Sequence, residues 1–455
     1  MAELITARYL VAPGGKVTTG NALVFEGPRI LEVGPVESCA RRYPGAERRN
    51  LGDSALSAGF VNAHMHLYGV LAHGLVPPVK VSSFEGFLGD YWWPLVENLL
   101  DARMVAAATR ASALELADSG VTSLCDILEA PLAGVEALEA EAAVLRELGI
   151  RAVLSSEACE RISPEAGRNT LDEGVAFARS LAGDALISAA LCTHTSFTCS
   201  ETFMKYAAGL AASTGVDLQL HLSESRYEPE WSLAHRGERP AEWYDRIGIL
   251  GRNLLAAQCV QVSGGEIELL ASRGVRAAHL PLSNCEVGGG IAPMPEMLRA
   301  GMACGLGTDG YVNDFFEVMR GAFLIHKGHR EDPAVMDAAT VWKMATEGGA
   351  DAVFPGRGLG RLEAGAQADF IAIDLSDLPS PSTEENLLDQ LILFRKGSHV
   401  RESRVAGRCV KRDGSLATGN LAEARAASRA EAARLWESGR EIARRAAAGS
   451  VEGGR

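Results

Sequence analysis

The stretch Gly59-Phe60-Val61-Asn62-Ala63-His64-Met65-His66-Leu67 begins as an apolar run and ends in two histidines one residue apart. The apolar start predicts a buried strand. Alternate side chains of a strand share a face, so His64 and His66 point the same way, about 6–7 Å apart along the strand. Two such imidazoles can converge on one metal ion, whereas an isolated His-x-His is more often a chance pairing in a loop. Features further along the chain favour the metal site.

Beyond this strand, short apolar segments alternate with amphipathic helical segments. The predicted strands are Phe60–Leu67, Val121–Ile127, Ala152–Glu157, Ile187–His194, Asp217–Leu222, Ala257–Val262, Val275–Leu280 and Ala303–Asp309. The predicted helices between them include Ala102–Ser119, Val135–Leu148, Thr202–Thr214 and Glu266–Ser272. This alternation predicts a (β/α)8 TIM barrel. The long interval 68–101 holds Tyr91-Trp92-Trp93-Pro94 and is predicted to form a lid or substrate loop.

Polar residues gather at the C-terminal ends of these predicted strands. They are His66, Asp126, Glu157, His194, His221 and Asp309. Barrel enzymes carry their chemistry on that face, whereas residues without a shared function would be scattered.

Both ends of the chain read as short strands separated by Gly and Pro turns. At the N-terminus these are Leu4–Val11, Ala22–Glu26 and Ile30–Val33, and after the barrel Leu359–Leu362, Asp369–Asp374, Val400–Val405 and Arg408–Lys411. We therefore expect the barrel, residues 58–357, to be inserted into a small β-sandwich domain made of residues 1–57 and 358–418. Residues 419–455 are expected to form a C-terminal helix and a tail.

The composition excludes some functions. The formal net charge of −14 argues against nucleic acid or an anionic membrane as the main partner. No segment approaches the ~18 uninterrupted apolar residues of a membrane span, and the N-terminus does not read as a signal peptide. The nine cysteines show no paired spacing. We expect reduced thiols and a cytoplasmic protein.

Three further segments carry groups suited to metal chemistry. In His221-Leu222-Ser223-Glu224, the histidine can supply a third nitrogen and Glu224 can hang over the same ion as a proton carrier. In Gly305-Leu306-Gly307-Thr308-Asp309-Gly310, a carboxylate at the end of the eighth strand would complete a site with room for water. Ala278-His279-Leu280-Pro281-Leu282-Ser283-Asn284 adds polar groups at the seventh strand.

The order of these motifs resembles the amidohydrolase superfamily, in its branch of aminohydrolases and chlorohydrolases. That branch includes deaminases of guanine, S-adenosylhomocysteine and methylthioadenosine, and the s-triazine hydrolases. The resemblance also covers Gly120-Val121-Thr122 and the segment 359–369. Within the branch, Asp90-Tyr91-Trp92-Trp93, 193–198 and 308–314 are most similar to the aminohydrolases linked to selenium and purine catabolism. The resemblance does not settle the substrate.

The resemblance implies that His64, His66, His221 and Asp309 hold one divalent ion, with Zn2+ favoured and Fe2+ as the alternative. Metal-bound hydroxide would then attack a C–N bond, other than a peptide bond, in a nitrogen heterocycle or cyclic amidine and release ammonia. Glu224 would carry protons to the leaving nitrogen, and Asp309 can also accept a proton from the water. Relatives in this branch are often homodimers or larger assemblies.

One position departs from the family pattern. A histidine normally ends the sixth strand, but here Gln258 stands in its place within Ala256-Ala257-Gln258-Cys259. Glutamine can donate hydrogen bonds but cannot take up a proton, so the loss could cost on the order of 10²–10⁴ in rate. Either His279 or His194 supplies the missing imidazole, or Glu224 and Asp309 suffice, or the reaction has changed or been lost. The alternative hypothesis is therefore a repurposed or impaired amidohydrolase-fold protein.

The remaining candidates are groups expected around a small heterocyclic substrate. His279 is expected in catalysis, and Gln258, His194, Trp92 and Asn284 are expected to contact the substrate. Trp92 could stack on a flat ring, although a tryptophan more often serves packing.

Overall fold

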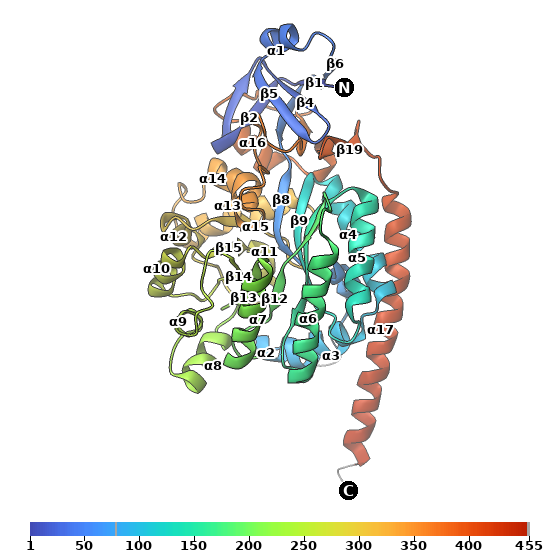
Figure 1. Cartoon of the computed structure of the whole chain (residues 1–455), viewed down its shortest axis with the longest axis vertical. Helices are drawn as coiled ribbons and strands as arrows, with labels where there is room; N and C mark the ends of the chain where they lie inside the picture. Colours follow the sequence, from blue (N-terminus) through green and yellow to red (C-terminus); the bar gives the residue numbers. More distant parts are fainter. Residues whose placement is uncertain (78–79, 453–455) are drawn as a thin grey trace.

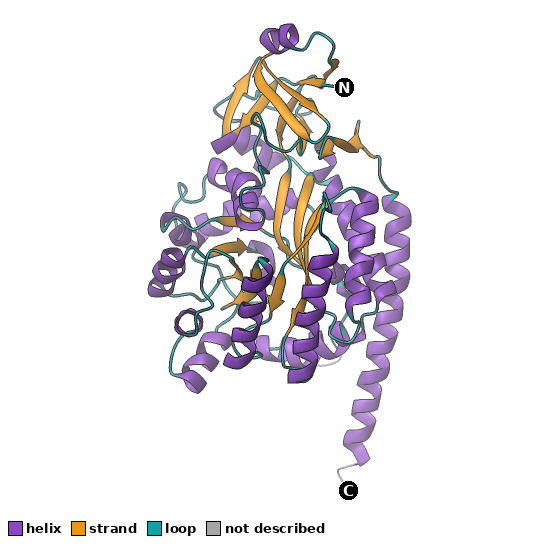
Figure 2. Ribbon diagram, viewed as in Figure 1, coloured by secondary structure: helices purple, strands orange, loops and turns teal. Residues whose placement is uncertain are grey.

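The computed structural model describes residues 1–77 and 80–452, and the last three residues of the predicted tail lie outside that range. Figure 1 shows a β-rich part, built from both ends of the chain, above a barrel wrapped in helices. Figure 2 shows that the strands of the barrel lie inside a layer of helices. The long helix α17 (Leu421–Glu452) runs down one side of the barrel.

The barrel consists of eight neighbouring parallel strands. In chain order they are β8 (Phe60–Met65), β9 (Val121–Leu128), β10 (Arg151–Ala158), β12 (Leu191–Thr193), β13 (Leu218–Leu222), β14 (Leu254–Gln258), β15 (Arg276–His279) and β16 (Cys304–Leu306), with β11 (Ile187–Ala189) as an extra partner of β10. The first and last strands meet where Met65 pairs with Asp309. There the Asp309 amide donates to the His64 carbonyl at 3.2 Å, which closes the barrel at the end where the polar residues gather.

The segments that follow the strands form helices because their sequences combine an apolar stripe with residues that cap the helix ends. The longer ones are α4 (Ala102–Asp118), α5 (Val135–Leu148), α6 (Pro164–Ser180), α7 (Glu201–Thr214), α8 (Tyr227–Arg236), α10 (Gly264–Arg273) and α13 (Phe315–Arg330). Short helices α9 (Pro240–Arg246), α11 (Pro281–Glu286), α12 (Met294–Arg299), α14 (Ala338–Lys343) and α15 (Gly349–Val353) fill the connections. Asp101 caps α4 by accepting from the Met104 amide, and Ser263 with Glu266 forms a capping box on α10.

The β-rich part contains two sheets. One has the order β5-β4-β1-β6, from Arg29–Pro35, Asn21–Glu26, Glu3–Thr6 and Glu47–Asn50. The other has the order β20-β19-β18-β17-β7-β2-β3, from Ser415–Leu416, Arg408–Arg412, Val400–Val405, Phe370–Asp374, Ser54–Ala58, Tyr9–Ala12 and Lys16–Thr19. Helices α1 (Val36–Arg42) and α16 (Leu387–Phe394) accompany them. The antiparallel pairing of β7 with β17 joins the two ends of the chain.

The interval between β8 and β9 folds into short helical turns at the end of the barrel away from the β-rich part (Figure 1). They are η2 (Leu67–Ala72), α2 (Phe84–Gly86), η3 (Phe87–Trp92), α3 (Trp93–Leu95) and η4 (Glu97–Leu99). Helix α17 packs against α4, α3 and η2, so the C-terminal segment supports this interval from outside.

Several predicted strand limits were wrong. The run Leu4–Val11 is two strands, and Ile187–His194 is likewise split. The sixth barrel strand ends at Gln258 rather than beginning near it, because Gln258 and Cys259 adopt positive φ of 74° and 51° and turn the chain. Residues 359–362, predicted as a strand, form a loop around Gly360, whose φ is 70°.

The predicted barrel and β-rich part are confirmed, while the exact domain boundaries stay predictions. Among the residues that the structure describes, every helix is either too short or too polar to cross a bilayer.

Candidate active site

The imidazoles of His64, His66 and His221 meet at the C-terminal end of the barrel. One ring nitrogen from each lies within 4.8 Å of the others. His64 and His66 come from the end of β8 and His221 from β13, so the first pair follows from strand alternation and the third from the closed barrel. The ring centroid of His64 lies 4.9 Å from that of His66 and 5.1 Å from that of His221.

Asp309 completes this group from the segment after β16. Its Oδ1 lies 3.1 Å from His66 Nε2 and 3.6 Å from His64 Nε2. Gly307 allows this approach, because a Cβ there would stand 2.5 Å from the His64 carbonyl oxygen. Burial raises the pKa of Asp309, but the adjacent imidazoles of His64 and His66 outweigh burial and hold it well below its usual range.

The four side chains fit a divalent metal ion. His64 is fully buried, yet among the described residues neither of its ring nitrogens has a hydrogen-bond partner. Such orphaned nitrogens are costly unless they bind something. His66 Nδ1 donates to the Ile127 carbonyl at 2.8 Å, which leaves Nε2 free to face Asp309. Three imidazole nitrogens and one carboxylate are a common catalytic donor set.

Glu224 lies in the loop that follows β13 and faces the same cavity. Burial, and then repulsion from the nearby Asp309 carboxylate, raises the pKa of Glu224 well above its usual range. A carboxyl group whose pKa is raised in this way is suited to exchanging protons with water and substrate.

Gln258 and Ser283 both donate to the second oxygen of Asp309. The distances from Gln258 Nε2 and Ser283 Oγ to Asp309 Oδ2 are 3.0 Å and 2.6 Å. The Asn284 amide in turn donates to the Gln258 carbonyl oxygen. Gln258 is thus part of a hydrogen-bond chain that holds Asp309.

A cavity of about 430 Å³ opens above these groups. Its polar lining includes His66, His221, Glu224, Gln258 and Asp309. The interval between β8 and β9 contributes Phe84, Phe87, Leu88, Tyr91 and Trp92. The rings of Phe87 and Trp92 stack with centroids 5.4 Å apart. The cavity therefore combines polar, ligand-type side chains with aromatic ones, as sites for planar ring compounds commonly do.

The structure places the other predicted site residues, His194, His279 and Asn284, at different distances from the cavity. His194 lines the cavity, whereas His279 is fully buried outside it, with Nε2 2.9 Å from His326 Nε2 on α13. Burial and His326 lower the pKa of His279 well below its usual range. The structure therefore does not bring His279 to the cavity as a replacement imidazole. Asn284 is buried, is not among the described residues that line the cavity, and donates to Gln258.

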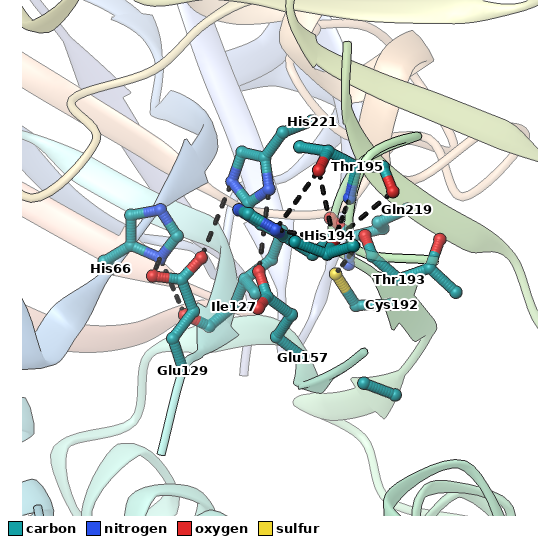
Figure 3. A network of polar contacts seen from close by, with 12 residues as sticks. His66, Ile127, Glu129, Glu157, Cys192, Thr193, His194, Thr195, Gln219 and His221 are labelled. Atoms are coloured by element: carbon teal, nitrogen blue, oxygen red, sulfur yellow. Dashed lines mark hydrogen bonds and ion pairs between the residues drawn. The ribbon is translucent and has the colours of Figure 1, made fainter. Parts of the chain in front are cut away.

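Glu129 and Tyr68 were not predicted as site residues, and Ser283 was counted only among the polar groups at the seventh strand. Glu129 follows β9 directly and is held by a hydrogen bond from the Tyr68 hydroxyl. Its carboxylate lies 3.9 Å from both His66 Nδ1 and His221 Nε2 (Figure 3). The signal that could have identified Glu129 is its position just after the second barrel strand. The predicted strand ended at Ile127, so Glu129 was not recognised as a residue at the strand end.

This buried donor set, on the catalytic face of a closed barrel, defines a metal-dependent hydrolase. The chain belongs to the amidohydrolase family, because a model of the Amidohydrolase family matches residues 55–403. It is an aminohydrolase of the type that removes ammonia from a nitrogen heterocycle, and a barrel without this activity is not favoured.

Two similar proteins are deaminases, and each matches this chain over almost its whole length. A 5-methylthioadenosine/S-adenosylhomocysteine deaminase of Syntrophobacter fumaroxidans is 33% identical over 419 residues, covering 90% of this chain and 92% of that protein. A 5'-deoxyadenosine deaminase of Methanopyrus kandleri is 31% identical over 412 residues, covering 89% and 93%.

Solved structures show the same fold. An adenosine deaminase from Xanthomonas campestris with bound zinc superimposes with a TM-score of 0.85 at 27% identity, covering 95% of this chain and 98% of that one. An atrazine chlorohydrolase from Arthrobacter aurescens TC1 has a TM-score of 0.80 at 20% identity, covering 94% and 99%, and shares the fold.

Proposed function

We propose that this protein hydrolyses the exocyclic amino group of a 6-aminopurine nucleoside and releases ammonia. The observation that carries the proposal is the buried imidazole and carboxylate set, which faces a cavity that aromatic side chains also line. The relatives that the chain resembles over nine-tenths of its length are named as deaminases of adenosine-type compounds, which supports this substrate class.

We propose zinc as the metal, bound by His64, His66, His221 and Asp309. The donor set suits zinc, and the similar Xanthomonas campestris enzyme is described with bound zinc. A bound divalent ion supplies a nucleophile at neutral pH by lowering the pKa of a coordinated water from about 15.7 toward about 7.

Side chains of the protein then orient the reacting groups and transfer protons. Glu224 takes a proton from the attacking water and delivers it to the ring nitrogen beside the carbon under attack. It next takes the proton of the newly attached hydroxyl group and delivers it to the departing amine, so the C–N bond breaks, a carbonyl group forms and ammonia leaves. Asp309 was also expected to accept a proton, but its Oδ2 already accepts two hydrogen bonds and its Oδ1 faces the imidazoles. We therefore assign proton transfer to Glu224.

Aromatic and polar side chains that line the cavity are proposed to hold the substrate. Trp92 is proposed to stack on the purine ring, and His194 and Gln258 are proposed to contact its polar edge, because all three line the cavity. A homodimer or larger homo-oligomer and a cytoplasmic location remain part of the proposal. The location is supported by nine free cysteines, all of them within the described residues.

The test is ammonia release by purified protein reconstituted with Zn2+. The panel is 5'-methylthioadenosine, S-adenosylhomocysteine, 5'-deoxyadenosine, adenosine, guanine and an amino-s-triazine. We expect turnover with one or more of the adenosine compounds, its loss on removal of the metal by a chelator, and its return on adding zinc. Turnover confined to guanine or the triazine would reject the substrate class, and no ammonia from any compound at full metal loading would reject the function.

A further inference from the structure

Another cavity, of about 360 Å³, lies where the barrel meets the β-rich part. Arg151, the first residue of β10, lines it from the barrel, while Arg29 at the start of β5 and Gln367 line it from the β-rich part. Glu157, near the other end of β10, belongs to the face that carries the candidate active site. At a rise of about 3.3 Å per residue, about 20 Å of strand separates Arg151 from that face.

The lining of this cavity is basic. Among the described residues it includes three guanidinium groups and no carboxylate. Its members are Arg29, Arg151, Ala185, Gly356, Arg357, Gly358, Leu359, Gly365 and Gln367. The chain as a whole has a net charge of −14, so this cavity departs from the average charge of the protein. A concave surface lined by charge of one sign concentrates ions of the opposite sign, which here are anions.

Within the described residues, a carboxylate balances one of these three positive charges. The buried Arg151 donates from Nε to Asp369 Oδ2 at 3.0 Å and from Nη2 to Asp369 Oδ1 at 3.3 Å. Arg29 donates at 3.0 Å to a backbone carbonyl, which carries no net charge. Neither Arg29 nor Arg357 forms an ion pair with a described carboxylate, and both side chains are exposed. Two positive charges therefore remain available to a ligand.

Glycines leave space between the arginines. A Cβ added at Gly356 or at Gly365 would meet no other heavy atom within 4 Å. Both glycines have positive φ, 75° and 88°, a conformation that residues with a side chain rarely adopt. The loops that carry them are therefore shaped so that no side chain at these positions fills the cavity.

We propose that Arg29, Arg151 and Arg357 form a binding site for a phosphate dianion, either free or as the phosphate group of a small ester. Two uncompensated guanidinium groups match its two negative charges, and their planar N–H forks pair with phosphate oxygens. The carboxamide of Gln367 adds N–H donors to the lining. A bound phosphate joins the barrel to the β-rich part, because its ligands come from both.

The experiment is isothermal titration calorimetry on the zinc-loaded protein, in a buffer of low, constant ionic strength that contains no phosphate or sulfate. Inorganic phosphate and ribose 5-phosphate are titrated separately, with acetate as a monoanion. The test variant is the double substitution Arg29→Gln and Arg357→Gln, because both side chains are exposed and Arg151 is left to its ion pair with Asp369. We expect the double variant to raise the Kd for the phosphate compound by at least about 10-fold, since it removes two charge-assisted donors.

The matched control is the double substitution Arg412→Gln and Arg429→Gln. It makes the same change in net charge at exposed residues of β19 and α17 that do not line the cavity. Because such distant surface charges are screened, the control should keep the Kd within about twofold of the wild type. Circular dichroism checks folding, and Arg357→Gln alone provides the comparison if the double variant does not fold.

The proposal is overturned if the wild type binds neither phosphate compound, or if the double variant binds them as tightly as the wild type does. In the second case the phosphate would lie elsewhere, for example on the zinc ion, which the double variant keeps. A Kd for acetate equal to that for phosphate would also overturn it. Tighter binding of ribose 5-phosphate than of phosphate would assign an ester, and the reverse order would assign the free ion. Ammonia release is not measured, so the outcome is independent of the proposed function.

Discussion

The side-chain amide of Gln258 donates a 3.0 Å hydrogen bond to Oδ2 of Asp309, the oxygen that faces away from the imidazoles. Asn284 fixes the amide from behind. The residue that departs from the family pattern is therefore integrated into the site, where it orients a proposed metal ligand.

Gln258→Leu should weaken metal binding or turnover by about 10–100-fold, the usual effect of losing a partner of a metal ligand. The change removes one of two donors to Asp309 and leaves the Asn284 amide unpaired. Zinc affinity from chelator competition and kcat would be measured. Gln261→Leu is the matched control, because Gln261 donates to the Gly289 carbonyl outside this chain of bonds.

Gln258→His tests whether the glutamine is a defect. If it were, the restored imidazole should raise kcat by on the order of 10²–10⁴. We expect no such gain, because Asn284 and Asp309 are arranged around an amide that accepts from one and donates to the other. A large gain, measured as kcat with the preferred substrate, would show that this arrangement is not the functional one.

Glu224→Gln should lower kcat by about 10²–10⁴-fold, because an amide cannot transfer protons. Metal content should be unchanged, since Glu224 lies outside the proposed ligand set. Steady-state kinetics and metal analysis on the same sample make the comparison. Glu286→Gln, another carboxyl group that lines the cavity, is the control and should retain most activity. Equal losses in both variants would contradict the assigned role.

Trp92→Ala should raise KM by about 2–10-fold with a smaller effect on kcat, since aromatic pairs contribute about 0.5–1.5 kcal/mol beyond burial. Trp92 lines the cavity, whereas Trp93 faces His194 and Arg161 and lines a different hollow. Trp93→Ala is therefore the comparison in the same steady-state assay. A fall in kcat alone for Trp92→Ala would argue against substrate stacking.

The stability of the fold should depend on pH through Glu141. Burial, and then the neighbouring Asp126 carboxylate, raises the pKa of Glu141 well above its ordinary value of 4.5. Below 4.5 both folded and unfolded chains hold this proton. As the pH rises above 4.5 the unfolded chain releases it first, so the contribution to stability is progressively lost as the pH passes through the folded pKa.

Glu141→Gln removes this titration while keeping the shape of the side chain. The melting temperature of the variant relative to the wild type should therefore be higher at pH 8 than at pH 5. Thermal unfolding at both pH values, in one buffer series of constant ionic strength, gives the difference. The assignment would be contradicted if the melting temperature of the variant minus that of the wild type were the same at both pH values, or lower at pH 8.

Much of the barrel could be read from the sequence, because strand and helix periods are local properties. Val135–Leu148 and Val400–Val405 have the predicted limits. The limits failed where a single backbone conformation decided them, as at Gln258 with its φ of 74°. His279 was expected at the site but turns toward His326, since the direction of a side chain at the end of a strand depends on the neighbouring helix.

The sequence by itself determined that His64 and His66 share a face, and that polar groups gather at the strand ends, because alternation and the parallel barrel order are set along the chain. Only the tertiary structure decided that Ser283 and Gln258 bond to Asp309, and that Glu129, 61 residues from Tyr68, lies against the imidazoles. These contacts join residues from different strands. They form only when the barrel closes and fixes which strand ends are neighbours.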